Sequence, residues 1–327
     1  MTTCPRFSHL LVLPRLRVQN ANAISSPLTH GFPSMTAFLG LAWALERKAR
    51  KAGIALEFNA VGVVSHGHQE QVTEGGFVKA FRLTRNPVDK DGSTAAIVEE
   101  GRIHLDLSLV LAVHAGHWDA DAQKADLSAI VELVSGMRVA GGTVLSPERP
   151  QPRRYQPWLA DFTGTEEDQR KAFREVCVRL LPGSTLVSRD DLIDRRLADL
   201  HAETPEATRL DAWLSLSRVN WHCDAEGEDD KGSWKHDRAD LGWAVPIPVG
   251  YGALGELHAA GSIPNARDAT TPFRFVESLY SMGEWIGPHR LRSPHDLLWY
   301  ADSRPDEKLY RCRNDYRPVA DFVGSTL

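Results

Sequence analysis

The 327-residue sequence contains few cysteines, and none of them forms a CxxC pair. Cys4, Cys177, Cys223 and Cys312 are far apart along the chain, which argues against a disulfide framework and against a structural zinc site. We therefore expect four reduced thiols, most of them buried.

Long apolar runs are also missing. No stretch approaches the roughly eighteen uninterrupted apolar residues that a membrane span needs. The apolar run at residues 10–13 is too short for a signal peptide, and Pro14 and Arg15 follow it without a small-residue cleavage site. These absences predict a cytoplasmic protein without membrane contact.

Strong catalytic signatures are absent as well. The sequence has no P-loop, no GxGxxG after a strand, no GxSxG and no HExxH. The histidine pairs at 66/68 and 114/117 have no carboxylate or cysteine at ligand spacing, so we expect no metal site. His104 and Asp106 share one side of a strand, where a solvated or helix-covered polar face is a better interpretation than a catalytic dyad. We predict a protein without enzymatic activity and without a cofactor.

Composition is otherwise that of an ordinary globular protein, at 42% hydrophobic and 25% charged residues. The net charge of −5 hides an uneven distribution. Residues 1–154 carry 17 Lys and Arg against 14 Asp and Glu, residues 155–240 carry 12 against 19, and residues 241–327 carry 9 against 10. This distribution suits a protein with one face for a polyanion and another for a protein partner.

Strand and helix patterns alternate over the first 150 residues. Strand patterns occur at 10–18, 56–64, 77–83, 103–113 and 143–145, and helix patterns at 33–52 and 119–137. They predict an α+β fold, and the order strand–helix–strand–strand–helix–strand is that of the ferredoxin-like or RRM-like sandwich. Pro14 interrupts the first strand, which indicates an edge position or a bulge. Residues 20–32 have loop composition, and Gly141-Gly142 would end the second helix.

Three segments are expected. Residues 1–150 would form the RRM-like core, with a loop of about twenty residues at 82–102 that is long enough to suggest a function. Residues 148–157 have the composition of a linker. The acidic segment 155–240 predicts helices at 166–181, 189–202 and 205–220 and would face a protein partner. Residues 241–327 mix short elements and would pack back on the core.

Two groups of polar residues are candidates for binding nucleic acid. Guanidinium and amide groups on the first strand and the loop after it can hold phosphates and base edges, although a polar strand end explains them too. Cations spaced along the 82–102 loop can follow a phosphate backbone, or can be balanced by Asp89 and Asp91. The first group is Arg15, Arg17, Gln19, Asn20 and Asn22, and the second is Arg82, Arg85, Asn86 and Lys90.

Several strings together resemble one known family. They are LPRLRVQNANAISSPLT (13–29), GFPS (31–34), LTRNP (83–87), DGSTAAIVEEGR (91–102), MRVAGG (137–142), NARD (265–268), RFVE (274–277), GEW (283–285) and PHR (288–290). These strings resemble the Csy2 (Cas-five) family of the type I-F CRISPR surveillance complex, within the RAMP superfamily. The resemblance runs from about residue 10 to residue 300 and is weakest at 224–238 and in the last 25 residues.

The resemblance implies a RAMP-type RRM-like core carrying a helical insertion and a thumb loop. It implies a non-catalytic, RNA-binding subunit of the Csy (Cascade) ribonucleoprotein of antiviral defence, which binds the 5′ handle of the crRNA. The implied protein partners are the large subunit and the first backbone subunit, and target DNA is a further candidate. Arg138, Arg267 and Arg290 lie in matching strings and join the candidate RNA-binding residues.

Two alternative functions stay open from the sequence. One is a metal-independent RNA-processing endoribonuclease that uses His66, His104 or His114 as a general base. The other is a protein-only scaffold that bridges partners through its acidic helices. The strand candidates at 10–18 and 103–113 lack aromatic residues, so contacts to phosphates and base edges would dominate over stacking.

Overall fold

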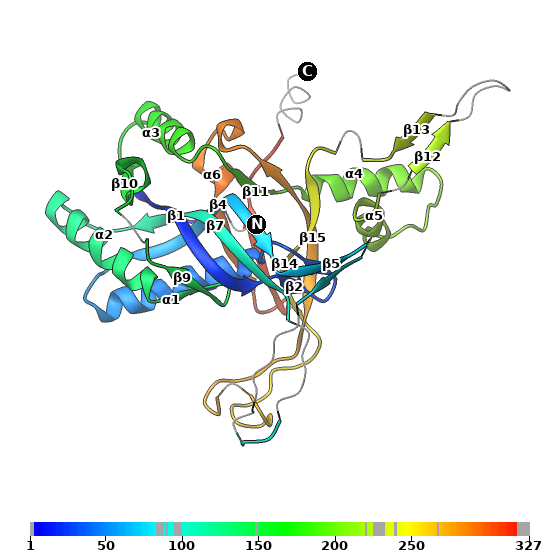
Figure 1. The fold of residues 1–327 in the computed structure, drawn as a ribbon, viewed down its shortest axis with the longest axis horizontal. Helices are drawn as coiled ribbons and strands as arrows, with labels where there is room; N and C mark the ends of the chain where they lie inside the picture. The colour runs from blue at the N-terminus through cyan, green and yellow to red at the C-terminus, as the bar shows by residue number, and fades with distance from the viewer. Residues whose placement is uncertain are drawn as a thin grey trace.

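The computed structural model describes residues 3–76, 78–82, 88, 91–94, 100–147, 150–219, 221–224, 233–238, 241–266 and 268–318. It is a mixed fold in which helices pack on a large antiparallel sheet (Figure 1), which confirms the predicted α+β class. In this part of the chain, no helix combines the length and apolar character needed to cross a membrane.

Six elements of the first 145 residues lie where strand and helix patterns predicted them. These are β1 (His9–Asn22), α1 (Met35–Lys51), β4 (Glu57–Glu70), β7 (Arg102–His114), α2 (Ala120–Ser135) and β9 (Gly142–Leu145). The strands lie side by side in the order β4-β7-β1-β9, with β8 (Arg138–Val139) beyond β9, and all these pairings are antiparallel. Ser34 caps α1 by accepting a hydrogen bond from the Thr36 amide.

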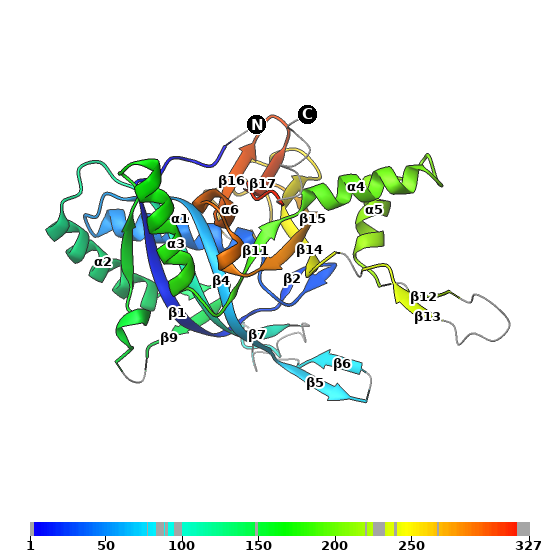
Figure 2. The same cartoon turned by 90° about the horizontal axis from the view of Figure 1, so that it is seen from above.

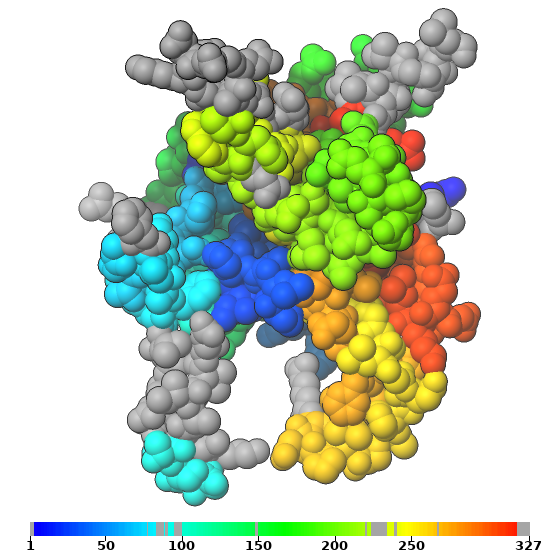
Figure 3. All heavy atoms as spheres, turned by 90° about the vertical axis from the view of Figure 1, so that its right-hand side faces the viewer, coloured from blue at the N-terminus to red at the C-terminus, as the bar shows by residue number. Residues whose placement is uncertain are grey.

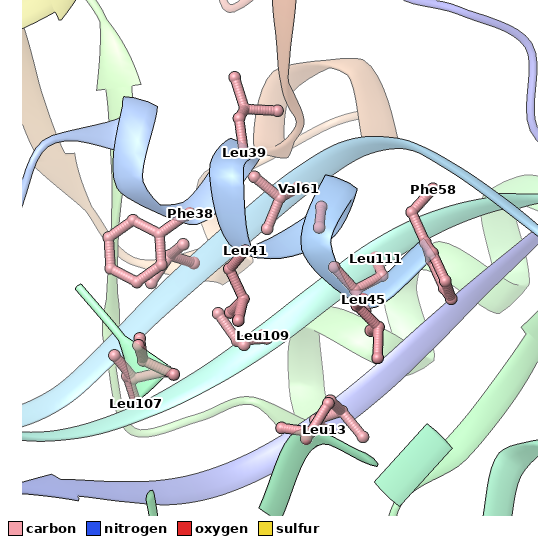
Figure 4. Packing of buried hydrophobic residues seen from close by; sticks show 14 of the residues in the cluster. Leu13, Phe38, Leu39, Leu41, Leu45, Phe58, Val61, Leu107, Leu109 and Leu111 are labelled. Atoms are coloured by element: carbon pink, nitrogen blue, oxygen red, sulfur yellow. The ribbon is translucent and has the colours of Figure 1, made fainter. Parts of the chain in front are cut away.

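Apolar side chains on one face of this sheet meet α1 and α2. Leu107, Leu109 and Leu111 of β7 alternate toward the helices and pack with Phe38 and Leu41 of α1 (Figure 4). Burying each such side chain contributes about 1.5–3 kcal/mol. The strict alternation of β7 therefore fixes which face of the sheet the helices cover.

The interpretation of Pro14 was half right. The register of β1 against β7 shifts between Leu13 and Leu16, so the predicted bulge is confirmed. An edge position is wrong, because β1 also pairs with β10 (Trp158–Asp161) and β9 on its other side. The bulge lets a central strand contain a residue that has no amide hydrogen to donate.

Two other local predictions were wrong. Residues 20–32 are not a loop, since β1 extends to Asn22 and a hairpin of β2 (Ile24–Ser26) and β3 (Thr29–His30) follows. Gly141-Gly142 does not end α2, which ends at Gly136. Gly141 lies instead in the tight turn between β8 and β9, where its φ of +80° favours glycine.

Strands from the second half of the chain continue the sheet beyond β4. They are β11 (Ser184–Ser188), β15 (Val276–Ile286), β14 (Ala244–Ala253), β17 (Leu309–Asn314) and β16 (Trp299–Arg304), paired in that order, with β16 next to β4. Because β11 pairs with β4 as well, these strands and β4 form a closed ring.

A second layer covers part of the opposite sheet face. It contains α3 (Glu166–Arg179), the short turn η2 (Pro288–Arg290) and α6 (Pro294–Leu297). Phe173 and Val176 of α3 join a buried cluster with Val12 of β1 and Val110 of β7. At this end the central strands are therefore buried on both faces.

A helical arm leaves the ring on the far side from α2 (Figure 2). It consists of α4 (Asp190–His201), α5 (Arg209–Leu216) and the hairpin of β12 (Trp221–Asp224) and β13 (Ser233–His236). The predicted helices at 166–181, 189–202 and 205–220 correspond to α3, α4 and α5. The buried Arg189 side chain ties the arm to β15, because it binds Asp191 at 2.8 and 2.9 Å and also contacts Glu284.

Two further segments project from the body. One is the hairpin of β5 (Val72–Gly75) and β6 (Val78–Phe81), and the other is the connection between β14 and β15. Figure 3 shows open space between that connection, in yellow and orange, and the described residues 91–94 opposite it. Phe81, at the root of the first projection, packs edge-on against His30 with ring centroids 5.6 Å apart.

Candidate nucleic-acid interface

The half of β1 beyond the bulge exposes polar side chains on the face opposite α1 and α2. Val18 and Ala21 lie in the core beneath those helices, and Leu16 packs against it. The residues between them on β1 therefore point away from this core. Arg17, Gln19 and Asn22 are accordingly exposed. We call this surface, with its neighbours on β4, β7, β8 and β9, the polar sheet face.

The neighbouring strand β7 contributes His104, Asp106 and Ser108 to the same face, since its leucines point to the helices. Asp106 lies opposite Arg17 in the ladder and binds the guanidinium of Arg15 at 3.0 Å. His104 accepts a hydrogen bond at 3.1 Å from the backbone amide of Asn20. Polar partners on β7 thus hold the backbone and one arginine of β1 in place.

Arg15 lies at the bulge and is held more tightly than the other candidates. Its backbone has a φ of +53°, and its amide donates to the Ser108 hydroxyl at 3.1 Å. Its guanidinium is paired with Asp106, and the side chain is 19% exposed. Arg15 therefore contributes a fixed positive charge, whereas the exposed Arg17 side chain has no ion-pair partner in the described part of the chain.

His66, at the border of this face, has both ring nitrogens occupied. Nδ1 lies 2.6 Å from the Pro182 carbonyl oxygen, which only accepts, so Nδ1 donates and Nε2 accepts from the Ser108 hydroxyl at 2.7 Å. Burial lowers the pKa of His66, and the nearby Arg15 adds to this effect. His66 is thus a neutral structural residue rather than a free base.

Aromatic rings and arginines line the flank of the face beside β1. The guanidiniums of Arg15 and Arg154 lie 5.2 and 4.4 Å from the centre of the Tyr155 ring. The guanidinium of Arg179 lies 3.5 Å from the centre of the Trp158 ring. These cation–π contacts place guanidiniums over aromatic rings, and both kinds of planar group can stack on the bases of single-stranded nucleic acid.

Sequence reasoning missed this flank. Residues 153–155 form the short helix η1 in a segment that was interpreted as a linker. The signal was available, because two arginines next to a tyrosine and three residues before a tryptophan are an interleaved basic and aromatic pattern. Only the folded chain shows that Tyr155 lies beside Arg15 at the edge of the polar sheet face, while Trp158 lies opposite Val12, next to the end of β1 that α3 covers.

The structure brings some of the other predicted residues to this face. Arg138 of β8 lies opposite Thr143 of β9, which lies opposite Gln19 of β1, so these three side chains form a row across the sheet. Within the described part of the chain, no carboxylate lies within ion-pairing distance of Arg17 or Arg138. Both cations are therefore available to a ligand.

The remaining candidates lie elsewhere. Arg82 is exposed just after β6, at the root of the projecting hairpin, where its amide donates to the Gln71 carbonyl oxygen at 3.0 Å. Arg290 lies on η2 in the second layer, 3.9 Å from Glu284 of β15, and not on the polar sheet face. Arg85, Asn86, Lys90 and Arg267 lie outside the described residues.

Metal ligands do not gather in the described residues, where no three His, Cys, Asp or Glu side chains form a cluster suited to a metal ion. The polar sheet face instead presents guanidinium, amide and imidazole groups. Beside it lie the rings of Tyr155 and Trp158, each of them under a guanidinium. Such groups bind phosphates, base edges and base faces.

Comparison with known proteins identifies the family. The family model described as CRISPR-associated protein (Cas_Csy2) matches residues 11–312. The chain is also 46% identical over 314 residues to the CRISPR-associated protein Csy2 of Pseudomonas aeruginosa strain UCBPP-PA14, which covers 92% of this chain and 94% of that protein. The chain therefore belongs to the Csy2 family of CRISPR-associated proteins, as its sequence motifs had suggested.

Proposed function

We propose that this chain is a non-catalytic RNA-binding subunit of a type I-F CRISPR surveillance complex, where it grips the 5′ handle of the crRNA. The observation that carries the proposal is the polar sheet face, where two arginines have no ion-pair partner among the described residues and α3 leaves the surface uncovered. A polyanion provides the missing negative charge, and binding it releases counterions.

The order β4-β7-β1-β9 with α1 and α2 on one face supports a ferredoxin-like, RRM-like core of the RAMP type. RRM domains hold single-stranded RNA on the open face of their sheet. In this chain, β1 and β7 supply arginine, amide and histidine groups on that face, and the aromatic rings come from Tyr155 and Trp158 at its flank.

The absence of catalysis is part of the proposal. His66 has both ring nitrogens in hydrogen bonds, and His104 uses Nδ1 to accept from Asn20. A general base needs a free nitrogen within reach of the 2′-hydroxyl that it deprotonates. The geometry favours holding RNA over cutting it.

The helical arm is the proposed contact with a protein partner such as the large subunit. Its described residues expose Leu210, Leu214, Trp221 and Trp234, each with 47–65% of its surface accessible. Exposed tryptophan side chains are typical of interface anchors. The complex would be a cytoplasmic ribonucleoprotein, with the first backbone subunit and target DNA as further proposed partners.

The test is co-expression with the other proteins of the CRISPR operon and a repeat–spacer RNA, followed by sequencing the 5′ ends of the RNA that co-purifies. We expect one shared 5′ sequence. The double change Arg17→Glu and Arg138→Glu should lower RNA per complex about tenfold or more, because it reverses two charges at the phosphates.

The matched control is Arg170→Glu with Arg174→Glu, two exposed arginines on α3. It makes the same change in net charge away from the polar sheet face and should leave bound RNA unchanged. RNA with random 5′ ends, or equal loss in both variants, would contradict the proposal and favour a protein-only scaffold. Cleavage of repeat RNA by the chain alone would favour the endoribonuclease.

A further inference from the structure

A cavity of about 620 Å³ opens on the far side of β4 from β7. The β2–β3 hairpin, the start of α1, the end of β4, β11 and β14 surround it. Its volume falls in the range of about 300–1,000 Å³ that is typical of sites for small organic groups. None of the residues predicted to bind RNA lines it.

Fixed aromatic rings form one wall of the cavity. Phe32 stacks on Phe38 with ring centroids 5.6 Å apart and meets Trp285 edge-on at 4.9 Å. Gly31, with a φ of +104°, makes the turn from β3 that places Phe32 there. The wall is therefore rigid and apolar before any ligand arrives.

Trp243 forms the rim of the same cavity and is 68% exposed. Its backbone is anchored, because its carbonyl oxygen accepts a hydrogen bond at 3.1 Å from the Trp285 amide. A large indole exposed at the mouth of an aromatic cavity can close over a flat ligand by stacking.

The other lining residues supply hydrogen-bonding groups. Ser65, His68 and Glu70 come from the end of β4, whereas the polar atoms of His66 and Ser34 in the same lining are already used in hydrogen bonds within the protein. Apolar walls with a few polar groups at the edge match the chemistry of a nucleobase, which has two apolar faces and a polar rim.

The end of β4 connects the cavity to the polar sheet face. Gly67 and Gln69 lie opposite Asp106 and His104 of that face, while Gly67 and its neighbours line the cavity. His66 also links the cavity to the polar sheet face, because its ring is hydrogen-bonded to the Ser108 hydroxyl, which in turn accepts a hydrogen bond from the Arg15 amide. A strand of RNA on the face therefore needs to cross only β4 for one base to enter the cavity.

We propose that this cavity binds one unpaired nucleobase of the RNA held on the polar sheet face, stacked between the Phe32–Trp285 wall and Trp243. The inference rests on the proposed RNA-binding function and adds to it a site that reads a single base. It also supplies the stacking that strands β1 and β7 themselves lack.

The test combines an abasic scan with substitution at Trp243. RNAs that lack the base at one position at a time are bound to the purified complex, with either wild-type Trp243 or Trp243→Ala. We expect one abasic position to weaken binding about tenfold, and Trp243→Ala to weaken intact RNA by a similar factor. The two losses should not add, because each removes the same stack.

Two variants frame the measurement. Trp243→Phe keeps an aromatic face and should restore most of the affinity. Trp43→Ala removes an exposed tryptophan, 41% accessible, from α1 on the other face of the sheet and should leave RNA affinity unchanged. The melting temperatures of the variants, compared with wild type, show whether each remains folded.

The outcomes separate this inference from the proposed function. If RNA affinity depends on Arg17 but no abasic position shows a loss that is coupled to Trp243→Ala, the base pocket is wrong and the proposed RNA-binding function still stands. If neither Arg17 nor any abasic site affects binding, the proposed function fails with it. If Trp243→Ala loosens a protein subunit in the absence of RNA, the cavity holds a protein side chain and the inference is wrong.

Discussion

The two ends of the central strands differ on the face that α1 and α2 do not cover. At one end, Leu10 and Val12 of β1 and Val110 of β7 are fully buried beneath α3. At the other end, Arg17 of β1 and His104 of β7 face outward. One pair of strands thus forms core at one end and the proposed binding surface at the other.

The sequence marks the change between the two ends. Residues 10–13 are uniformly apolar, as expected of a strand buried on both faces. Buried and exposed residues alternate after the bulge at Pro14 and Arg15, with a second register shift between Val18 and Ala21. The lesson is that the point where a strand stops being uniformly apolar predicts where its cover ends. A binding face can be located in this way before the covering helix is known.

The covered end should depend most strongly on packing. Phe173→Ala in α3 empties a buried site, since Phe173 is 2% exposed, and should lower the free energy of unfolding by about 3–5 kcal/mol. Urea unfolding of the full chain, followed by tryptophan fluorescence, measures the loss. Val178→Ala, at a position 60% exposed on the same helix, should cost less than about 0.5 kcal/mol. Similar decreases in the free energy of unfolding in both variants would mean that α3 does not bury the central strands.

The open end should show the opposite behaviour. Arg17→Ala should change the free energy of unfolding by less than about 0.5 kcal/mol, because the side chain is exposed and has no described ion pair. It should reduce the slope of log K for RNA against log salt by about 1, through loss of one phosphate contact. Binding measured at several salt concentrations gives the slope. If Arg17→Ala and the control Arg174→Ala give the same slope of log K against log salt, Arg17 does not contact the RNA phosphates.

The border between the two ends should respond to pH. Burial lowers the pKa of His66 below its ordinary value of 6.5, so the unfolded chain binds this proton more readily than the folded chain. The contribution of His66 to the free energy of unfolding should therefore be complete above pH 6.5. It should be lost as the pH falls, by no more than about 1.4 kcal/mol per pH unit. His66→Gln should flatten the slope.

His9, whose pKa burial also lowers, remains in that variant and leaves a residual slope in the same direction. Urea unfolding at a series of pH values between 5 and 8 distinguishes the two contributions. An unchanged slope in His66→Gln would show that the histidine is charged, or equally solvated, in both states.

Regular and local features could be predicted from the sequence. The six leucine, isoleucine and valine residues that alternate along β7 defined its face, and the serine cap with a late glycine defined α1. The bulge followed from one proline. Each of these signals is contained within a few neighbouring residues, where periodicity and backbone chemistry decide the structure.

Features that depend on distant pairings could not be predicted. The β2–β3 hairpin has strands of three and two residues, too short to show a period. Pairing of β11 with β15 joins Leu186 to Trp285, and no local pattern encodes that register. The same limit applies within the site, where only the ladder shows that Arg15 is paired with Asp106 while Arg17 is left available.

The closed ring has a consequence for how the molecule comes apart. A sheet with a free end can lose its strands one at a time from that end, and here the path of paired strands ends at β8 on one side only. On the other side it returns to β4, which holds β7, β11 and β16 at once. Fraying of the outer hairpin therefore stops before β4. Residues 61–65 of this strand, which borders both the proposed RNA face and the proposed base pocket, should exchange their amide hydrogens last.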